Sequence, residues 1–118
     1  MDFSQYCCDN YCYNALITSV YDGDTVTCNI DLGFGIIMNK QKIRLFGINT
    51  PEVRGESRPE GLKVRDYVRN LIVNKKIKLY TLKDKSGKYG RLLGIIYIDD
   101  LCINSDLLEK NYAVKFMI

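Results

Sequence analysis

Short apolar runs, several of them alternating with polar residues, occupy two stretches of the chain. Alternation with a period of two predicts strands that bury one face. The run Lys42-Ile43-Arg44-Leu45 shows this pattern, with the charged residues expected to point outward. The strands expected from these runs are 15–21, 25–31, 36–39, 42–48, 77–82 and 92–98.

The segment between the two stretches has the spacing of an amphipathic helix. Ser57-Arg58-Pro59-Glu60 fits a capping box, with the proline in the first turn, where its missing N–H leaves no helical bond unmade. The polar side of the helix carries Lys63, Arg65 and Arg69, which we expect to be a solvated face rather than a ligand-binding patch. The apolar stripe consists of Val64, Val68, Leu71 and Ile72.

Turn residues and a second, shorter helix complete the pattern. Asp22-Gly23 is typical of a hairpin turn, and Gly33 with Gly35 indicates another. A short helix is expected over 104–110, ending at Asn111 in the left-handed conformation.

The order strands, helix, strands, helix predicts an α+β fold, a small five-stranded β-barrel of the OB kind with two helices. With 118 residues the chain forms one domain, expected over 13–118 after a flexible tail over 1–12. No run approaches the roughly 20 apolar residues of a membrane span. The N-terminal residues lack the basic start and apolar core of a signal peptide, so we expect an intracellular protein without a membrane partner.

The chain contains no histidine, which excludes an imidazole base, a histidine-ligated metal and a serine–histidine pair. The net charge of +3 is unevenly placed, because the segment 63–91 holds ten basic residues and only two acidic ones. Such a basic block suits a polyanion. The five cysteines, Cys7, Cys8, Cys12, Cys28 and Cys102, do not form a disulfide pattern, and we expect Cys28 and Cys102 to be buried.

Several polar residues stand next to the predicted strands in a pattern that suits phosphate-ester chemistry. Asp22 and Asp24 lie in one turn, and carboxylate, amide and carbonyl oxygens are what a hard cation such as Ca²⁺ binds. Arg44 and Arg91 each offer a planar guanidinium that grips two phosphate oxygens. Two guanidiniums around a phosphorane neutralise charge that grows in the transition state.

Four motifs in order resemble the staphylococcal nuclease (thermonuclease) family. They are Asp22-Gly23-Asp24-Thr25, Arg44, Thr50-Pro51-Glu52 and Lys88-Tyr89-Gly90-Arg91. The resemblance covers roughly residues 14–116, and the third helix of the family has no counterpart here. It implies an OB-fold barrel and a calcium-dependent nuclease that cleaves DNA and RNA with little sequence preference. Nucleic acid is then the expected partner and Ca²⁺ the expected cofactor, with Mg²⁺ as the alternative.

The resemblance also implies a set of metal ligands. Asp24 resembles the metal-ligating aspartate, Asp22 the supporting acid beside it, and Thr50 the residue that offers its backbone carbonyl. Asn49 stands where the best-known member of the family has a second metal-binding aspartate. Asparagine keeps a ligating oxygen but removes one negative charge, so we expect a weakened calcium site rather than a lost one.

The remaining implied roles concern the substrate. Glu52 resembles the general base that orients the attacking water, and Arg44 and Arg91 resemble the phosphate-binding pair. Tyr89, together with Lys88, resembles the residues beside the nucleotide.

Each of these residues also has a purely structural interpretation. Asp22 and Asp24 are common turn residues, Glu52 can serve as an acid at a helix entry, Arg44 can be a solvated outward charge, and Tyr89 can be packing.

Two other functions stay open beside the nuclease. One is a nuclease-like module that binds nucleic acid or a protein without cleavage, and the other is an OB-fold binder of single strands.

Overall fold

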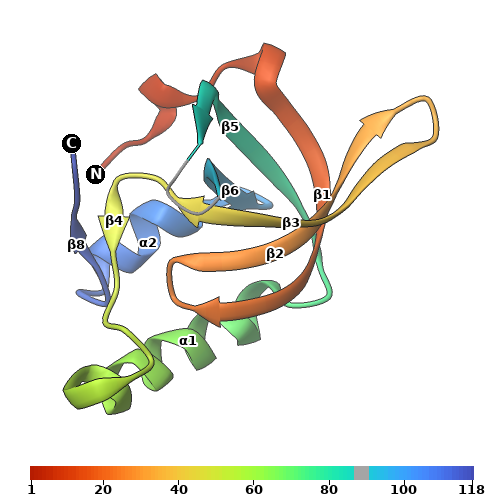
Figure 1. Ribbon diagram of the computed structural model, residues 1–118. Helices are drawn as coiled ribbons and strands as arrows, with labels where there is room; N and C mark the ends of the chain where they lie inside the picture. The colour runs from red at the N-terminus through yellow and green to blue at the C-terminus, as the bar shows by residue number, and fades with distance from the viewer. Residues whose placement is uncertain (87–90) are drawn as a thin grey trace.

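Five strands close into a mixed β-barrel (Figure 1). The computed structural model describes residues 1–86 and 91–118. Antiparallel pairing joins the strands in the order β3-β2-β1-β5-β6, and parallel pairing of β3 with β6 closes the barrel. The predicted α+β barrel with two helices is confirmed. The strands are β1 (Cys12–Asp22), β2 (Thr25–Gly33), β3 (Ile36–Leu45), β5 (Lys76–Ser86) and β6 (Leu92–Ile98).

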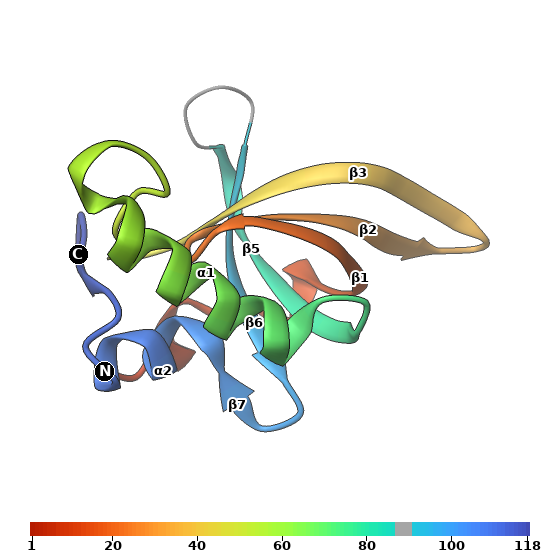
Figure 2. The same ribbon diagram turned by 90° about the horizontal axis from the view of Figure 1, so that it is seen from below.

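The strands expected over 36–39 and 42–48 form the single strand β3, which ends earlier than expected. Lys40 lies in the left-handed region (φ 55°), and its N–H donates to Asn29 Oδ1 at 2.9 Å, beside an irregularity in the β2–β3 register. A bulge of this kind lets the strand continue past the interruption. After Leu45, a turn at Gly47 (φ 80°) leads into the short strand β4 (Ile48–Asn49). The β2–β3 hairpin projects from the barrel, away from the chain termini (Figure 2).

Helix α1 (Arg58–Ile72) buries Gly61, Val64, Val68 and Ile72, largely the face that the apolar stripe predicts. The predicted capping box does not form. Ser57 already has helical backbone angles, because the 3-10 turn η3 (Gly55–Ser57) runs directly into the helix. Its hydroxyl donates instead to the backbone carbonyls of Glu52 and Arg54, at 3.0 and 3.2 Å. The start of α1 is thereby tied to the loop that carries Glu52.

Helix α2 (Ile103–Glu109) is fixed to the barrel by one buried amide. Asn104 accepts the N–H of Ile96 at 3.1 Å and donates to the carbonyls of Phe46 and Gly94 at 2.9 and 3.2 Å. The predicted left-handed residue after the helix is confirmed, since Asn111 has φ 60°. Two short strands flank α2: β7 (Leu101–Cys102), which pairs with β6, and β8 (Val114–Lys115), which pairs with β4.

The segment before β1, expected to be a flexible tail, packs against the barrel. It forms the turns η1 (Ser4–Tyr6) and η2 (Asp9–Tyr11). Phe3 is fully buried in the core, and the ring of Tyr6 lies 4.9 Å from that of Phe46. The two rings bury apolar surface, which holds the segment in place. Cys28 is buried as predicted, whereas Cys102, also expected to be buried, is only partly so. No helix in the described part of the structure has the length and apolarity needed to cross a membrane.

Candidate functional site

The turn between β1 and β2 places one carboxylate in a buried cluster. Asp24 is only 5 % exposed. Its Oδ2 accepts the backbone N–H of Thr50 at 2.9 Å and lies 3.3 Å from Arg44 Nη2, while Oδ1 accepts the hydroxyl of Thr25 at 3.1 Å. These partners compensate the cost of burying a charge. The fold thus brings together Asp24, Arg44 and Thr50 from three separate segments.

Arg44 is held as firmly as the carboxylate. Its Nη1 donates to the carbonyls of Leu45 and Ile48, both at 2.9 Å, and its Nη2 donates to Asn49 Oδ1 at 3.1 Å. The guanidinium also lies over the ring of Phe116, 5.6 Å from its centroid. With a side chain only 12 % exposed, Arg44 is a fixed member of the cluster and not a solvated outward charge.

Asp22 lies beside Asp24 in the same turn. Its Oδ1 accepts the backbone N–H of Asp24 at 3.3 Å. Burial, followed by the side-chain hydrogen bond and the charge of the Asp24 carboxylate, raises the pKa of Asp22 to about 7, against the smaller lowering effect of the Asp24 backbone N–H. Ionisation of Asp22 is therefore unfavourable in its partly buried place beside the Asp24 carboxylate.

The cluster offers a set of oxygen donors that suits a hard cation. The donors are the carboxylates of Asp22 and Asp24, the amide oxygen of Asn49 and the oxygens of Thr50. The hydroxyl of Thr50 is buried and has no hydrogen-bond partner among the described residues. Calcium and magnesium prefer such oxygen ligands, so the residues fit an ion of this kind. Within residues 1–86 and 91–118, no group of three His, Cys, Asp or Glu side chains is placed to hold a metal.

An open cavity of about 860 Å³ adjoins the cluster. Its floor is built from outward side chains that pair across three strands. One row is Ser19, Thr27 and Lys42, and the next is Asp22, Thr25 and Arg44. All of these except Arg44 line the cavity. Asp22 and Thr25 therefore connect the buried cluster with the open space.

The cavity is strongly basic. Its other lining residues are Val20 and Tyr21 of β1 and residues from the loop 52–54, from α1 and from the position that precedes β6. The basic side chains are Lys42, Arg54, Arg65, Arg69 and Arg91, five in all, against the two carboxylates Asp22 and Glu52. This excess of positive charge suits a polyanion.

The expectation that Arg65 and Arg69 form a solvated face is wrong. Both line the cavity, and the side chain of Arg65 is only 23 % exposed. Helical periodicity places them beside the buried stripe, but it does not tell how far the barrel wall covers that side of the helix. The one available signal was their spacing of four residues, which puts two guanidiniums on the same face. Of the three basic residues expected on the solvated face, Lys63 is exposed.

Glu52 lies at the rim of the cavity. Its Oε2 is 3.6 Å from Arg54 Nε, and both side chains are largely exposed, so this ion pair is weak. The backbone of the loop is better fixed than the side chain. Arg58 Nη1 donates to the carbonyl of Val53 at 2.8 Å, and Ser57 holds the carbonyl of Glu52. The carboxylate of Glu52 thus stays accessible on a positioned backbone.

Gly61 lets α1 approach this loop closely. A Cβ at this position would overlap the carbonyl oxygen of Glu52 and lie 2.9 Å from that of Pro51.

We expect Gly61→Ala to push the loop away and to destabilise the protein by about 1–3 kcal/mol, as overpacking does. Chemical denaturation measures the loss. Asn70→Ala, on the exposed side of the same helix, is the control and should stay within about 0.5 kcal/mol. A Gly61→Ala protein as stable as the control would contradict the close contact.

The predicted residues Lys88 and Tyr89 lie outside the described part of the chain. Arg91, which precedes β6, is described and lines the basic cavity.

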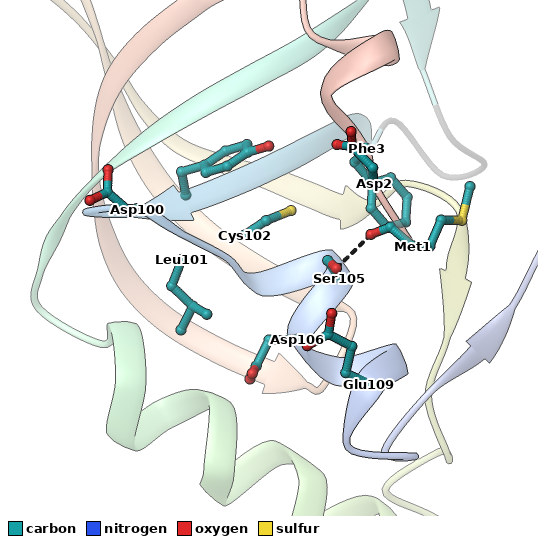
Figure 3. Close-up of a pocket in the computed structure, with 10 residues that line it drawn as sticks. Met1, Asp2, Phe3, Asp100, Leu101, Cys102, Ser105, Asp106 and Glu109 are labelled. Atoms are coloured by element: carbon teal, nitrogen blue, oxygen red, sulfur yellow. Dashed lines mark hydrogen bonds between the residues drawn. The ribbon is translucent and has the colours of Figure 1, made fainter.

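A second cavity, of about 510 Å³, lies between the N-terminal residues and α2 (Figure 3). Ser105 Oγ donates to the carbonyl of Met1 there at 2.6 Å. Its charged lining is acidic, with Asp2, Asp100, Asp106 and Glu109. Asp106 is already bound by the Tyr67 hydroxyl and by Lys110. This cavity therefore does not suit an anionic ligand.

Comparison with known sequences agrees with this geometry. The staphylococcal nuclease homologue family matches residues 42–118. A thermonuclease of Staphylococcus hyicus is 26 % identical over 100 residues, covering 82 % of this chain and 56 % of its own length. A probable staphylococcal-like nuclease of Oryza sativa subsp. japonica is 29 % identical over 112 residues, covering 93 % of this chain and 28 % of its own.

An endonuclease of Bacillus subtilis is 27 % identical over 106 residues, covering 85 % of this chain and 46 % of its own length. This chain thus spans about half the length, or less, of these relatives. The matched residues include Arg44, Asn49, Thr50, Glu52 and Arg91, which the fold gathers around one carboxylate cluster and one basic cavity. The chain belongs to the staphylococcal nuclease homologue family.

Proposed function

We propose that this chain is a divalent-metal-dependent phosphodiesterase that hydrolyses the backbone of DNA or RNA with low sequence specificity. One observation carries the proposal: the buried Asp24 cluster opens through Asp22 and Thr25 onto a basic cavity that also holds Glu52 and Arg91. Cation donors, phosphate-binding groups and a carboxylate base are thus collected in one place. The nuclease names of the relatives support the same chemistry.

Asp22, Asp24, the amide oxygen of Asn49 and the carbonyl of Thr50 are the residues proposed to hold Ca²⁺, with Mg²⁺ as the alternative. When bound, such a cation polarises a phosphoryl oxygen and neutralises part of its charge. The buried hydroxyl of Thr50, which has no hydrogen-bond partner within residues 1–86 and 91–118, is a further oxygen donor on the same residue.

Arg91 makes the first contact with the phosphate in this proposal, because it lines the cavity. Arg44 makes the second contact, by exchanging its bond to Asn49 for a phosphate oxygen. The carbonyls of Leu45 and Ile48 keep the Arg44 guanidinium in place meanwhile. A guanidinium whose position is already fixed stabilises developing charge with little reorganisation.

Glu52 is the proposed general base. It takes a proton from the attacking water as the new oxygen–phosphorus bond forms and the bond to the leaving oxygen breaks. Its accessible carboxylate at the cavity rim can meet both water and phosphate there.

Cleavage of labelled single-stranded DNA and of RNA, each with Ca²⁺, with Mg²⁺ and with EDTA, tests the proposal. Arg91→Ala runs beside the unchanged protein. Metal-dependent cutting that EDTA abolishes and the substitution lowers would support the enzyme. Binding without cleavage in the presence of either metal would contradict the enzyme and favour the non-catalytic nucleic-acid-binding module.

Asn49→Asp is expected to tighten calcium binding, because affinity at such sites rises with the number of charged ligands. Isothermal titration calorimetry measures the change, which should be a lower dissociation constant for Ca²⁺. Gln41→Glu adds the same charge on the outer part of β3, at a residue that does not line the cavity, and serves as the control. Equal affinities of Asn49→Asp and the unchanged protein would remove Asn49 from the ligand set.

A further inference from the structure

Two arginines of α1 enter the basic cavity from a side that none of the assigned roles uses. Arg65 and Arg69 are one helical turn apart on the same face and both line the cavity. The proposed metal ligands, the base and the phosphate-binding pair come from the β1–β2 turn, β3, the segment 49–52 and the residue that precedes β6. The helix therefore adds two guanidiniums beyond those that one phosphate needs.

The contacts of these arginines orient them without cancelling their charge. Arg69 Nη2 donates to the carbonyl of Val20 at 3.2 Å, and no carboxylate of the described residues lies within ion-pair distance of it. Arg65 binds Asp66 Oδ1 through Nε and Nη2, at 3.1 and 3.0 Å. The side chain of Asp66 is 58 % exposed, so solvent weakens this ion pair. The two bonds to Asp66 use Nε and Nη2 of Arg65, which leaves Nη1 for another acceptor.

The cavity is large enough for more than the reacting phosphate. Its volume of about 860 Å³ lies near the upper end of pockets that bind whole small molecules. Between the arginines of α1 and Lys42, the floor carries the hydroxyls of Ser19 and Thr27, which can donate to phosphate oxygens. One cavity thus offers two groups of cations joined by a polar floor.

We infer that Arg65 and Arg69 form a second phosphate subsite, which binds a phosphate neighbouring the one that is cleaved. The inference rests on the proposed function and names its substrate class: nucleic-acid fragments that carry at least one phosphate beyond the scissile one. That phosphate is either the next internucleotide phosphate or a terminal one, because both present the same oxygens to the guanidiniums.

Competition binding in EDTA tests the subsite without cleavage. The probe is a labelled single-stranded DNA of 20 thymidines, displaced by thymidine dinucleotide, by the dinucleotide with a terminal phosphate, or by the trinucleotide. The first competitor has one phosphate and the others have two. We expect the second phosphate to tighten binding to the unchanged protein by about tenfold, the size of a charge-assisted contact.

The double substitution Arg65→Gln/Arg69→Gln should remove most of this gain, so that one-phosphate and two-phosphate competitors bind alike. The control is Lys63→Gln/Lys75→Gln, which removes the same charge from exposed residues outside the cavity and should keep the gain. Arg69→Lys, which retains the charge, should keep part of the gain in affinity. Three results would overturn the subsite. The double variant could show the same gain as the unchanged protein, the control could lose the gain to the same extent as the double variant, or the unchanged protein could show no gain.

The two competitors with two phosphates separate the sources of the anion. A gain with the trinucleotide alone assigns the subsite to an internucleotide phosphate, and a gain with the phosphorylated dinucleotide extends it to a terminal one. In the same samples, the slope of log K against log salt for the DNA probe should fall by about 0.7 for every phosphate that the double variant no longer binds. Because these readouts need no cleavage, an inactive protein that keeps the gain would refute the proposed hydrolysis and leave the subsite standing.

Discussion

Glu52→Gln is expected to lower the rate of phosphodiester cleavage by about 10²–10⁴-fold while nucleic-acid binding is retained, because the amide keeps the shape of the carboxylate but accepts no proton. The folded state should be little affected. Glu52 is 68 % exposed, and its ion pair with Arg54 is weak. Single-turnover cleavage at saturating protein measures the chemical step, and displacement of a labelled strand measures binding.

Glu56→Gln is the matched control for this prediction. Glu56 is exposed in the same loop, in the turn η3, and does not line the cavity. Its substitution removes the same charge near the site and should change the rate by less than about threefold, since a rim charge outside the reaction contributes little. A Glu52→Gln protein that cuts as fast as this control would exclude Glu52 as the base.

Arg44→Ala is expected to destabilise the protein by about 3–5 kcal/mol and to abolish cleavage. The substitution leaves the buried carboxylate of Asp24 without its counter-charge, and breaking one partner of a buried pair costs about this much. The carbonyls of Leu45 and Ile48 lose a donor at the same time. Denaturant unfolding of the purified protein in EDTA measures the loss of stability.

Arg54→Ala removes an arginine whose side chain is 78 % exposed in the same site, and it should change the free energy of unfolding by less than about 0.5 kcal/mol. Arg44→Lys tests the geometry, because an ammonium cannot reproduce the fork that binds two carbonyls, Asn49 and Asp24 together. An Arg44→Ala protein as stable as Arg54→Ala would contradict a stabilising buried pair of Arg44 with Asp24.

The barrel was predictable because its information is local. Alternating runs fix which faces are buried, and Asp22-Gly23 fixes the first hairpin. The boundary of β3 was not predictable in the same way. The chain bends at Phe46–Gly47 because Gly47 has φ 80° and because Phe46 donates its N–H to Gly94 of β6 at 2.8 Å. That partner lies far away in the sequence.

The candidate site, too, was predictable only where the information is local. The motifs marked Asp24, Arg44 and Thr50, and the structure places them in contact. The motifs did not show that the amide oxygen of Asn49 accepts a hydrogen bond from Arg44. They also did not show that Arg65 and Arg69 enter the cavity. Both facts depend on how far one element covers another, which periodicity along a single helix or strand does not contain.

The capping box failed for a related reason. Ser57 has the residue type and the spacing, yet η3 places it inside the helical conformation before the cap position is reached. Its hydroxyl then bonds backward to the loop of Glu52 and Arg54. Local preference was overridden by a contact that positions a candidate catalytic residue.

The most direct test of the proposed function is a calcium titration on protein first stripped with EDTA, with cleavage of a labelled single strand and calorimetric binding measured on the same preparation. We predict no cutting before calcium is added, and a rate that rises with the same half-saturation as metal binding. Asp24→Asn should lose both together. Cutting that persists in EDTA, or calcium that binds fully while the strand stays intact, would contradict a metal-dependent phosphodiesterase built on the Asp24 cluster.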